Sequence, residues 1–217
     1  MSTVTGSIHL YRSLCMGLLW SLLVCPGLTA EELAAGTTVV VVRHAEKATL
    51  PAEDPVLTEM GMQRARIFAT MLDSARVSAI YTTQFARNMQ TAIAVAQRQG
   101  VSPTVLPITS GKVPEYALAL RRDIALNHPG ATVVVVAHSN TIDDIILALG
   151  GPDIGDLSED YYNRIFILSF GNSGEASVIE AAFPPLNWVA GLDSPKASWI
   201  SLSQIASIFP TLLSKIC

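Results

Sequence analysis

Two histidines and two arginines, far apart in the sequence, are the residues with the clearest chemical potential. Arg43 and His44 adjoin each other after an apolar run, Arg87 lies near the start of a helical stretch, and His138 ends a second apolar run. A guanidinium carries five N–H donors in a plane, which suits the oxygens of a phosphoryl group. A neutral histidine can attack phosphorus, and a second histidine can donate a hydrogen bond to the developing charge. These residue types therefore indicate phosphoryl transfer, which depends on positioning and electrostatic stabilisation.

Three predicted strands would bring these side chains to one edge of a sheet. The β-branched runs 37–42 (TTVVVV) and 132–137 (TVVVVA) are typical of strands buried on both faces, and 77–81 is the third strand. Ligands of open parallel sheets bind at the carboxyl ends of the strands, where both histidines follow. Backbone N–H groups at the starts of the next helices would add positive potential there.

The remaining pattern predicts an α/β fold, a three-layer sandwich with a mostly parallel central sheet flanked by helices. Apolar residues recur at helical spacing over 57–72, 85–99, 114–127 and 140–149, with Thr58 and Asn140 as N-caps and Gly100 as a C-terminal stop. Further strands are expected at 104–108, 165–170 and 176–182.

Composition divides the chain and excludes some classes of protein. Residues 1–30 are expected to be a signal peptide, 31–184 the phosphoryl-transfer domain and 185–217 an apolar C-terminal appendage. We expect an exported protein, periplasmic or secreted, with a membrane anchor formed by the N-terminal segment as the alternative. The appendage either packs on the domain or contacts a membrane or a partner. Half of the residues are apolar and the net charge is −4, which argues against a disordered chain and against a nucleic-acid binder.

Four segments resemble, in order, motifs of the histidine phosphatase superfamily, also called phosphoglycerate mutase-like. They are VRHAE at 42–46, LTEMG at 57–61, TTQFARNMQTA at 82–92 and VVAHSN at 135–140. Each is weak alone, and their order makes the resemblance specific. It favours the short-loop phosphatase branch.

The resemblance implies a metal-independent phosphatase that forms a phosphohistidine intermediate. His44 would be the nucleophile, and Arg43, Arg87 and His138 would form the phosphate pocket. No metal and no organic cofactor are expected.

The proton donor for the leaving group stays open. Branches with a catalytic Glu usually carry it soon after the strand that corresponds to 104–108, where the nearest acid here is Glu115. Another branch places Asp after the second histidine, where this chain has Ser139. Glu46 is the other candidate, with pairing to Lys47 as its alternative role. Glu115 is also placed to complement a helix dipole. The third option is that no dedicated acid exists.

Three other interpretations compete with this one. A phosphoglycerate-mutase-type phosphotransferase is the nearest, and a non-catalytic phosphate-binding module is the second. A two-histidine, one-carboxylate metal site would use His44, Glu46 and His138, but the adjacent Arg43 is unfavourable for a cation.

The substrate cannot be inferred from these motifs. The segments 47–56 and 152–160 are the expected rim of the site. Short loops suggest an open site, and the partners expected are a phosphorylated small molecule, a phosphoprotein or a cell-envelope phosphate.

Overall fold

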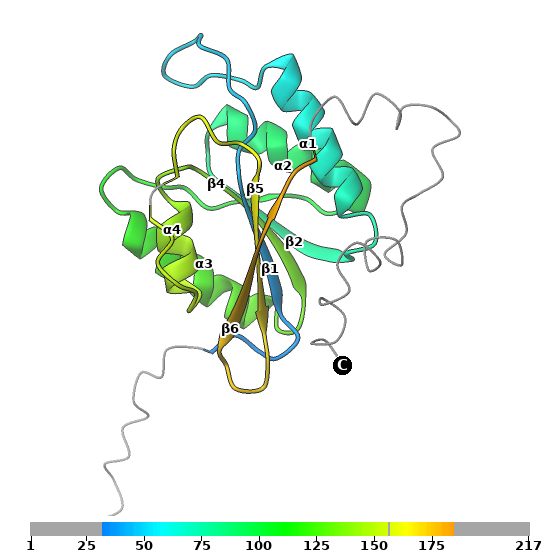
Figure 1. The fold of residues 1–217 in the computed structure, drawn as a ribbon, viewed down its shortest axis with the longest axis vertical. Coiled ribbons are helices and arrows are strands. Elements are labelled where there is room, and N and C mark those ends of the chain that lie inside the picture. Colours follow the sequence, from blue (N-terminus) through cyan, green and yellow to red (C-terminus); the bar gives the residue numbers. More distant parts are fainter. Residues whose placement is uncertain (1–31, 156, 185–217) are drawn as a thin grey trace, which may run out of the picture. The chain divides into compact units, whose positions relative to one another are not determined.

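A six-stranded sheet organises residues 32–155 and 157–184, the part of the chain that the computed structural model describes. Its strands are β1 (Thr38–Arg43), β2 (Val77–Thr82), β3 (Thr104–Val105), β4 (Thr132–Ala137), β5 (Arg164–Phe170) and β6 (Ala176–Ala182). Their order across the sheet is β3-β2-β4-β1-β5-β6 (Figure 1). The first four pair in parallel, whereas β5 is antiparallel to both β1 and β6. The sheet is therefore mixed, and its parallel part carries the strand ends where the two histidines follow.

Helices cover both faces of this sheet. They are α1 (Glu59–Met71), α2 (Ala86–Gln99), α3 (Val113–Asn127) and α4 (Ile142–Ala148). The first two pack together on one face, and α3 and α4 pack together on the other. The predicted α/β sandwich is confirmed.

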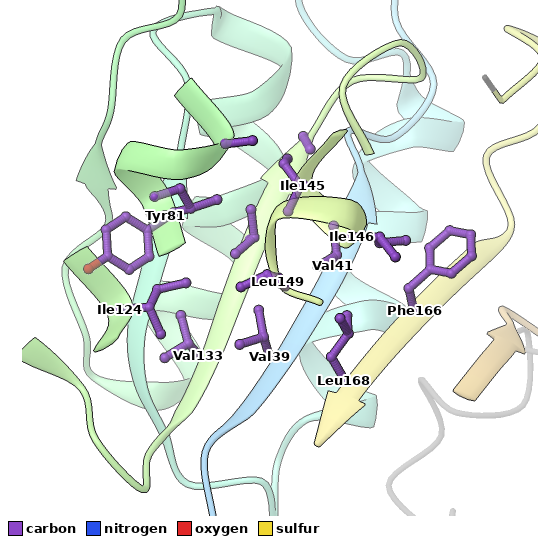
Figure 2. Close-up of a cluster of buried hydrophobic side chains, with 14 of the residues drawn as sticks. Val39, Val41, Tyr81, Ile124, Val133, Ile145, Ile146, Leu149, Phe166 and Leu168 are labelled. Carbon is purple, nitrogen blue, oxygen red and sulfur yellow. The ribbon is translucent and has the colours of Figure 1, made fainter. Parts of the chain in front are cut away.

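Alternation along the central strands builds one core on each face. Val39 and Val41 of β1 point toward α3 and α4, in the cluster that Figure 2 shows. Val40 and Val42 point the other way, toward α1 and α2. Both sides are buried, so the strand needs an unbroken apolar run rather than an alternating one. Burial of each such side chain stabilises the fold by about 1.5–3 kcal/mol.

Two predicted boundaries differ from the structure. β3 covers two residues instead of 104–108, because the side chain of Gln84 takes over the pairing there. Gln84 donates to the carbonyl of Ile108 (2.8 Å) and accepts from its N–H (2.9 Å). Asn140 is not the N-cap of α4. That position belongs to Thr141, whose hydroxyl accepts the backbone N–H of His138 instead of capping the helix (3.0 Å).

The predicted N-cap of α1 is confirmed. The Thr58 hydroxyl accepts the N–H of Gly61 at 3.1 Å, and the Thr58 N–H donates to the Glu46 carbonyl at 2.9 Å. Helix α1 therefore starts directly against the segment that follows His44. A Cβ on Gly61 would lie 3.0 Å from Glu46 N and closer still to its carbonyl oxygen. Only glycine permits this approach of two backbones.

The predicted signal peptide at 1–30 and the appendage at 185–217 lie outside the described residues, so both stay predictions. Over 32–155 and 157–184, no helix is long and apolar enough to cross a membrane.

Gly61→Ala is expected to destabilise the domain, because the new methyl group meets backbone atoms that cannot rotate away. Overpacking of this kind costs typically about 1–3 kcal/mol. Urea unfolding should show the loss, with Gly171→Ala as the matched control because a Cβ there meets nothing within 4 Å. Equal midpoints for the two variants would contradict the close approach.

Candidate active site

The parallel pairing of β1 with β4 places the two histidines side by side. Arg43 is in register with Ala137, and the N–H of His44 donates to the Ala137 carbonyl at 2.9 Å. His44 and His138 follow directly, with ring centroids 5.5 Å apart in an edge-to-face arrangement. Both histidines are buried. The sheet thus unites residues that are far apart in the sequence.

The His44 ring has one fixed orientation. Its Nδ1 lies 2.8 Å from the carbonyl oxygen of Ala45. A carbonyl only accepts, so Nδ1 carries the hydrogen and Nε2 carries the lone pair of the neutral ring. The Nε of Arg87 donates to this Nε2 at 3.3 Å. The ring nitrogen that carries the lone pair therefore faces a guanidinium.

Burial keeps both histidines uncharged. It lowers the pKa of His44 to about 3, against the opposing hydrogen bond to Ala45 and with help from the charge of Arg43. Burial, followed by the charges of Arg87 and Arg43, lowers the pKa of His138 to about 4. At neutral pH His44 is therefore free to act as a nucleophile.

Helix α2 binds the backbone at the end of β4 and in the segment that follows His44. Asn88 is fully buried and donates to the last two carbonyls of β4, at 3.1 Å each. The Thr91 hydroxyl accepts the N–H of Ala45 at 3.1 Å, and Gln90 accepts the N–H of Leu57 at 2.7 Å. Besides Arg87, the segment 82–92 thus supplies three polar side chains that bind backbone groups around the site.

Arg43 is hydrogen-bonded to a loop from a distant part of the chain. Its Nη1 donates to the carbonyls of Ser158 (3.3 Å), Glu159 (2.7 Å) and Tyr161 (3.3 Å). Its Cζ lies 4.0 Å from the ring centroid of Tyr162. Its buried Nε has no hydrogen-bond partner among the described residues. A buried donor without a partner is costly, and an anion bound here would satisfy it.

Arg87 is supported by an aromatic ring and a carboxylate. Its Cζ lies 4.6 Å from the ring centroid of Phe85, and that ring also contacts His138 (5.3 Å between centroids). Asp54 lies 3.7 Å from Arg87 Nη1 and accepts the N–H of Ala86 at 2.9 Å. Each arginine is therefore positioned by an aromatic face.

Some residues of the site were not predicted from the sequence. Tyr162 contacts His44 (6.0 Å between ring centroids), and the Thr83 hydroxyl lies 3.0 Å from His138 Nε2. Thr83 belongs to the motif 82–92, but the motif alone does not indicate this contact. Asp54 lies inside the predicted rim segment 47–56, and Tyr162 lies just beyond the other, so proximity to the rim was the only signal for both.

The first candidate acid, Glu46, is held in a buried ion pair. Arg64 Nε donates to both carboxylate oxygens at 2.9 Å, and Arg64 Nη2 donates to Oε1 at 2.6 Å. The predicted alternative of pairing with Lys47 is wrong, since Lys47 pairs with Glu159 at 3.5 Å. Arg64 comes from α1, so the ion pair ties this helix to the segment that follows His44.

The second candidate acid, Glu115, is exposed in the first turn of α3. No interaction recorded for the described residues joins it to either histidine. Its position agrees with the predicted role of complementing the helix dipole.

The metal interpretation gains no support from this geometry. Its carboxylate, Glu46, is occupied by Arg64. In the part of the chain that the structure describes, no three His, Cys, Asp or Glu residues are grouped to hold a metal ion.

Both site histidines are expected to stay neutral far below the usual imidazole range in phosphate-free buffer. Their folded-state pKa values, about 3 and about 4, lie below an unfolded value of about 6.5. Between these values the unfolded chain binds more protons, so the free energy of unfolding decreases as pH falls below about 6.5. Nitrogen-15 NMR of the imidazole rings should show that both stay neutral as the pH falls through about 6.5. The variants His44→Asn and His138→Asn assign the two signals. A midpoint near 6.5 at either position would contradict the environment described.

The chain resembles known proteins in part of its sequence and in its fold. Residues 39–108 match the model of the histidine phosphatase superfamily (branch 1). None of the curated proteins matches the sequence. The protein histidine phosphatase SixA complexed with tungstate is similar in structure, with a TM-score of 0.54 and 20% identity over 70% of this chain and 99% of that one.

Two further solved structures share the fold. Bacillus stearothermophilus YhfR has a TM-score of 0.55 and 19% identity, covering 69% of this chain and 98% of its own. A mycobacterial glucosyl-3-phosphoglycerate phosphatase has a TM-score of 0.51 and 16% identity, covering 67% and 97%. The match to the histidine phosphatase superfamily thus covers residues 39–108, and the solved structures show that the chain shares their fold.

Proposed function

We propose that this protein is a metal-independent phosphatase that hydrolyses phosphomonoesters through a phosphohistidine on His44. The main support is the fixed orientation of the His44 ring. Its Nδ1 is hydrogen-bonded to the Ala45 carbonyl, and its Nε2 faces Arg87. The family match and the phosphatases among the similar structures support hydrolysis over a mutase reaction.

In the first step the Nε2 lone pair forms a bond to phosphorus, and the bond from phosphorus to the leaving oxygen breaks. The leaving group takes that electron pair. Arg87 and the unpaired Nε of Arg43 would bind the phosphoryl oxygens, and the N–H of neutral His138 would donate to them. The ring of His44 gains positive charge in this step, which strengthens the Nδ1–H bond to the Ala45 carbonyl.

In the second step a water molecule attacks phosphorus and the N–P bond breaks. The electron pair returns to Nε2, inorganic phosphate leaves, and the proton lost by the water passes to solvent. The oxyanion released in the first step takes up a proton from solvent after it has departed. His44 is then neutral again, as the low pKa of the buried ring requires.

The leaving group would receive no dedicated acid from Glu46 or Glu115, the two predicted candidates. Glu46 is held by Arg64, and Glu115 is exposed on α3. The rim carboxylates Asp54 and Glu159 each lie beside a cation. We infer that the enzyme favours leaving groups that depart without protonation, such as those of aryl phosphates or of compounds phosphorylated on nitrogen. Its setting outside the cytoplasm, with a phosphorylated small molecule, phosphoprotein or cell-envelope phosphate as substrate, belongs to the same proposal.

Incubation with ³²P-labelled phenyl phosphate, followed by denaturation at alkaline pH, is expected to leave acid-labile label on His44. His44→Ala should lose the label and roughly 10⁴-fold or more of turnover, because the nucleophile is gone. Peptide mass spectrometry locates the phosphoryl group. Label that persists in the variant would refute the assignment.

The inferred lack of an acid predicts a steep dependence of rate on leaving-group basicity, since a positioned acid contributes about 10²–10⁴-fold. A series of aryl and alkyl phosphates should show equal slopes in the wild type, Glu115→Gln and Glu159→Gln. A shallow slope in the wild type that steepens in one variant would identify that residue as the donor.

A further inference from the structure

A third cation, Lys47, lies near the four residues that would bind the scissile phosphoryl group. Lys47 follows the nucleophile by three residues, and an antiparallel bridge to Leu57 fixes its backbone. Its Nζ lies 3.5 Å from a carboxylate oxygen of Glu159. The Lys47 side chain is 34% exposed and that of Glu159 is 72% exposed. This ion pair is therefore open to solvent.

Both partners are tied to the phosphate pocket. The backbone carbonyl of Glu159 accepts from Arg43 Nη1 at 2.7 Å, so its side chain starts beside that guanidinium. After burial and the two arginines, the charge of Lys47 is the next factor that lowers the pKa of His138. Lys47 and Glu159 thus lie within electrostatic reach of the residues that would hold the scissile phosphoryl group.

Two carboxylates at the rim, Asp54 and Glu159, are held differently. Asp54, beside Arg87, also accepts a backbone N–H from the start of α2 at 2.9 Å. Among the described residues the Glu159 carboxylate forms an ion pair with Lys47, and it lies within electrostatic reach of Arg43 and Arg87. An exposed pair of this length contributes little stability, so an anion of higher charge can replace the carboxylate.

We propose that Lys47 forms a subsite for a second anionic group of the substrate, with Glu159 as its displaceable counter-ion. The substrate class is then a phosphomonoester with a phosphate or carboxylate close to the scissile phosphoryl group. This inference rests on the proposed function, which it deepens by naming the substrate class.

Calorimetric binding of methylphosphonate and methylenediphosphonate to the full chain, in metal-free buffer, tests the subsite without turnover, because their P–C bonds are not hydrolysed. Wild type is expected to bind the diphosphonate more tightly than the monophosphonate. Lys47→Met should reduce this preference by up to about fivefold, the upper end of the scale for one exposed charge pair. Glu159→Gln should increase it, because the ammonium loses its competitor while the backbone carbonyl on Arg43 remains. Lys112→Met, which removes an equal charge from an exposed position at the start of α3, serves as the control.

Opposite shifts in Lys47→Met and Glu159→Gln separate a binding role from a structural one. If the ion pair only stabilised the rim, both variants would change the preference in the same direction, and that result would overturn the subsite. An unchanged preference in both variants would overturn it too. Failure of the proposed function would be detected in the labelling experiment, as an absence of label on His44. That result does not depend on the ratio of the two dissociation constants measured here.

Discussion

The parallel pairing of β1 with β4 is the constraint on which the site depends. Both strands are buried on both faces, and the register sets Arg43 beside Ala137. A slip by one residue would turn the valines of β1 to the opposite cores and separate His44 from His138. The core and the site are thus specified by the same pairing.

Helix α2 turns this pairing into a defined geometry. Its first turns carry Arg87 toward His44, while Asn88 and Thr91 bind the backbone at the ends of β4 and β1. These buried hydrogen bonds hold backbone groups that would otherwise be without partners. Helix α2 therefore sets the position of the guanidinium relative to both histidine segments.

Charge is distributed in two zones. Inside, two buried neutral histidines lie among arginines that aromatic rings support. At the rim, Asp54 and Glu159 balance Arg87 and Lys47. The inner zone would bind the transferred group, and the more exposed outer zone would meet the rest of the substrate. Ion pairs at the rim are weak enough to exchange partners.

The amino-acid sequence alone was enough to predict the α/β layers and the four residues that gather at the strand ends. Apolar runs and helical spacing are local signals, and parallel strands bring the residues after their carboxyl ends to one edge of the sheet. The sequence did not reveal that Glu46 pairs with Arg64, that Tyr162 supports Arg43, or that Lys47 meets Glu159. These side-chain pairs depend on how α1 and the loop before β5 pack against the segment after His44. Such contacts leave no periodic pattern in the sequence, so they are fixed only when the distant segments pack together in the folded chain.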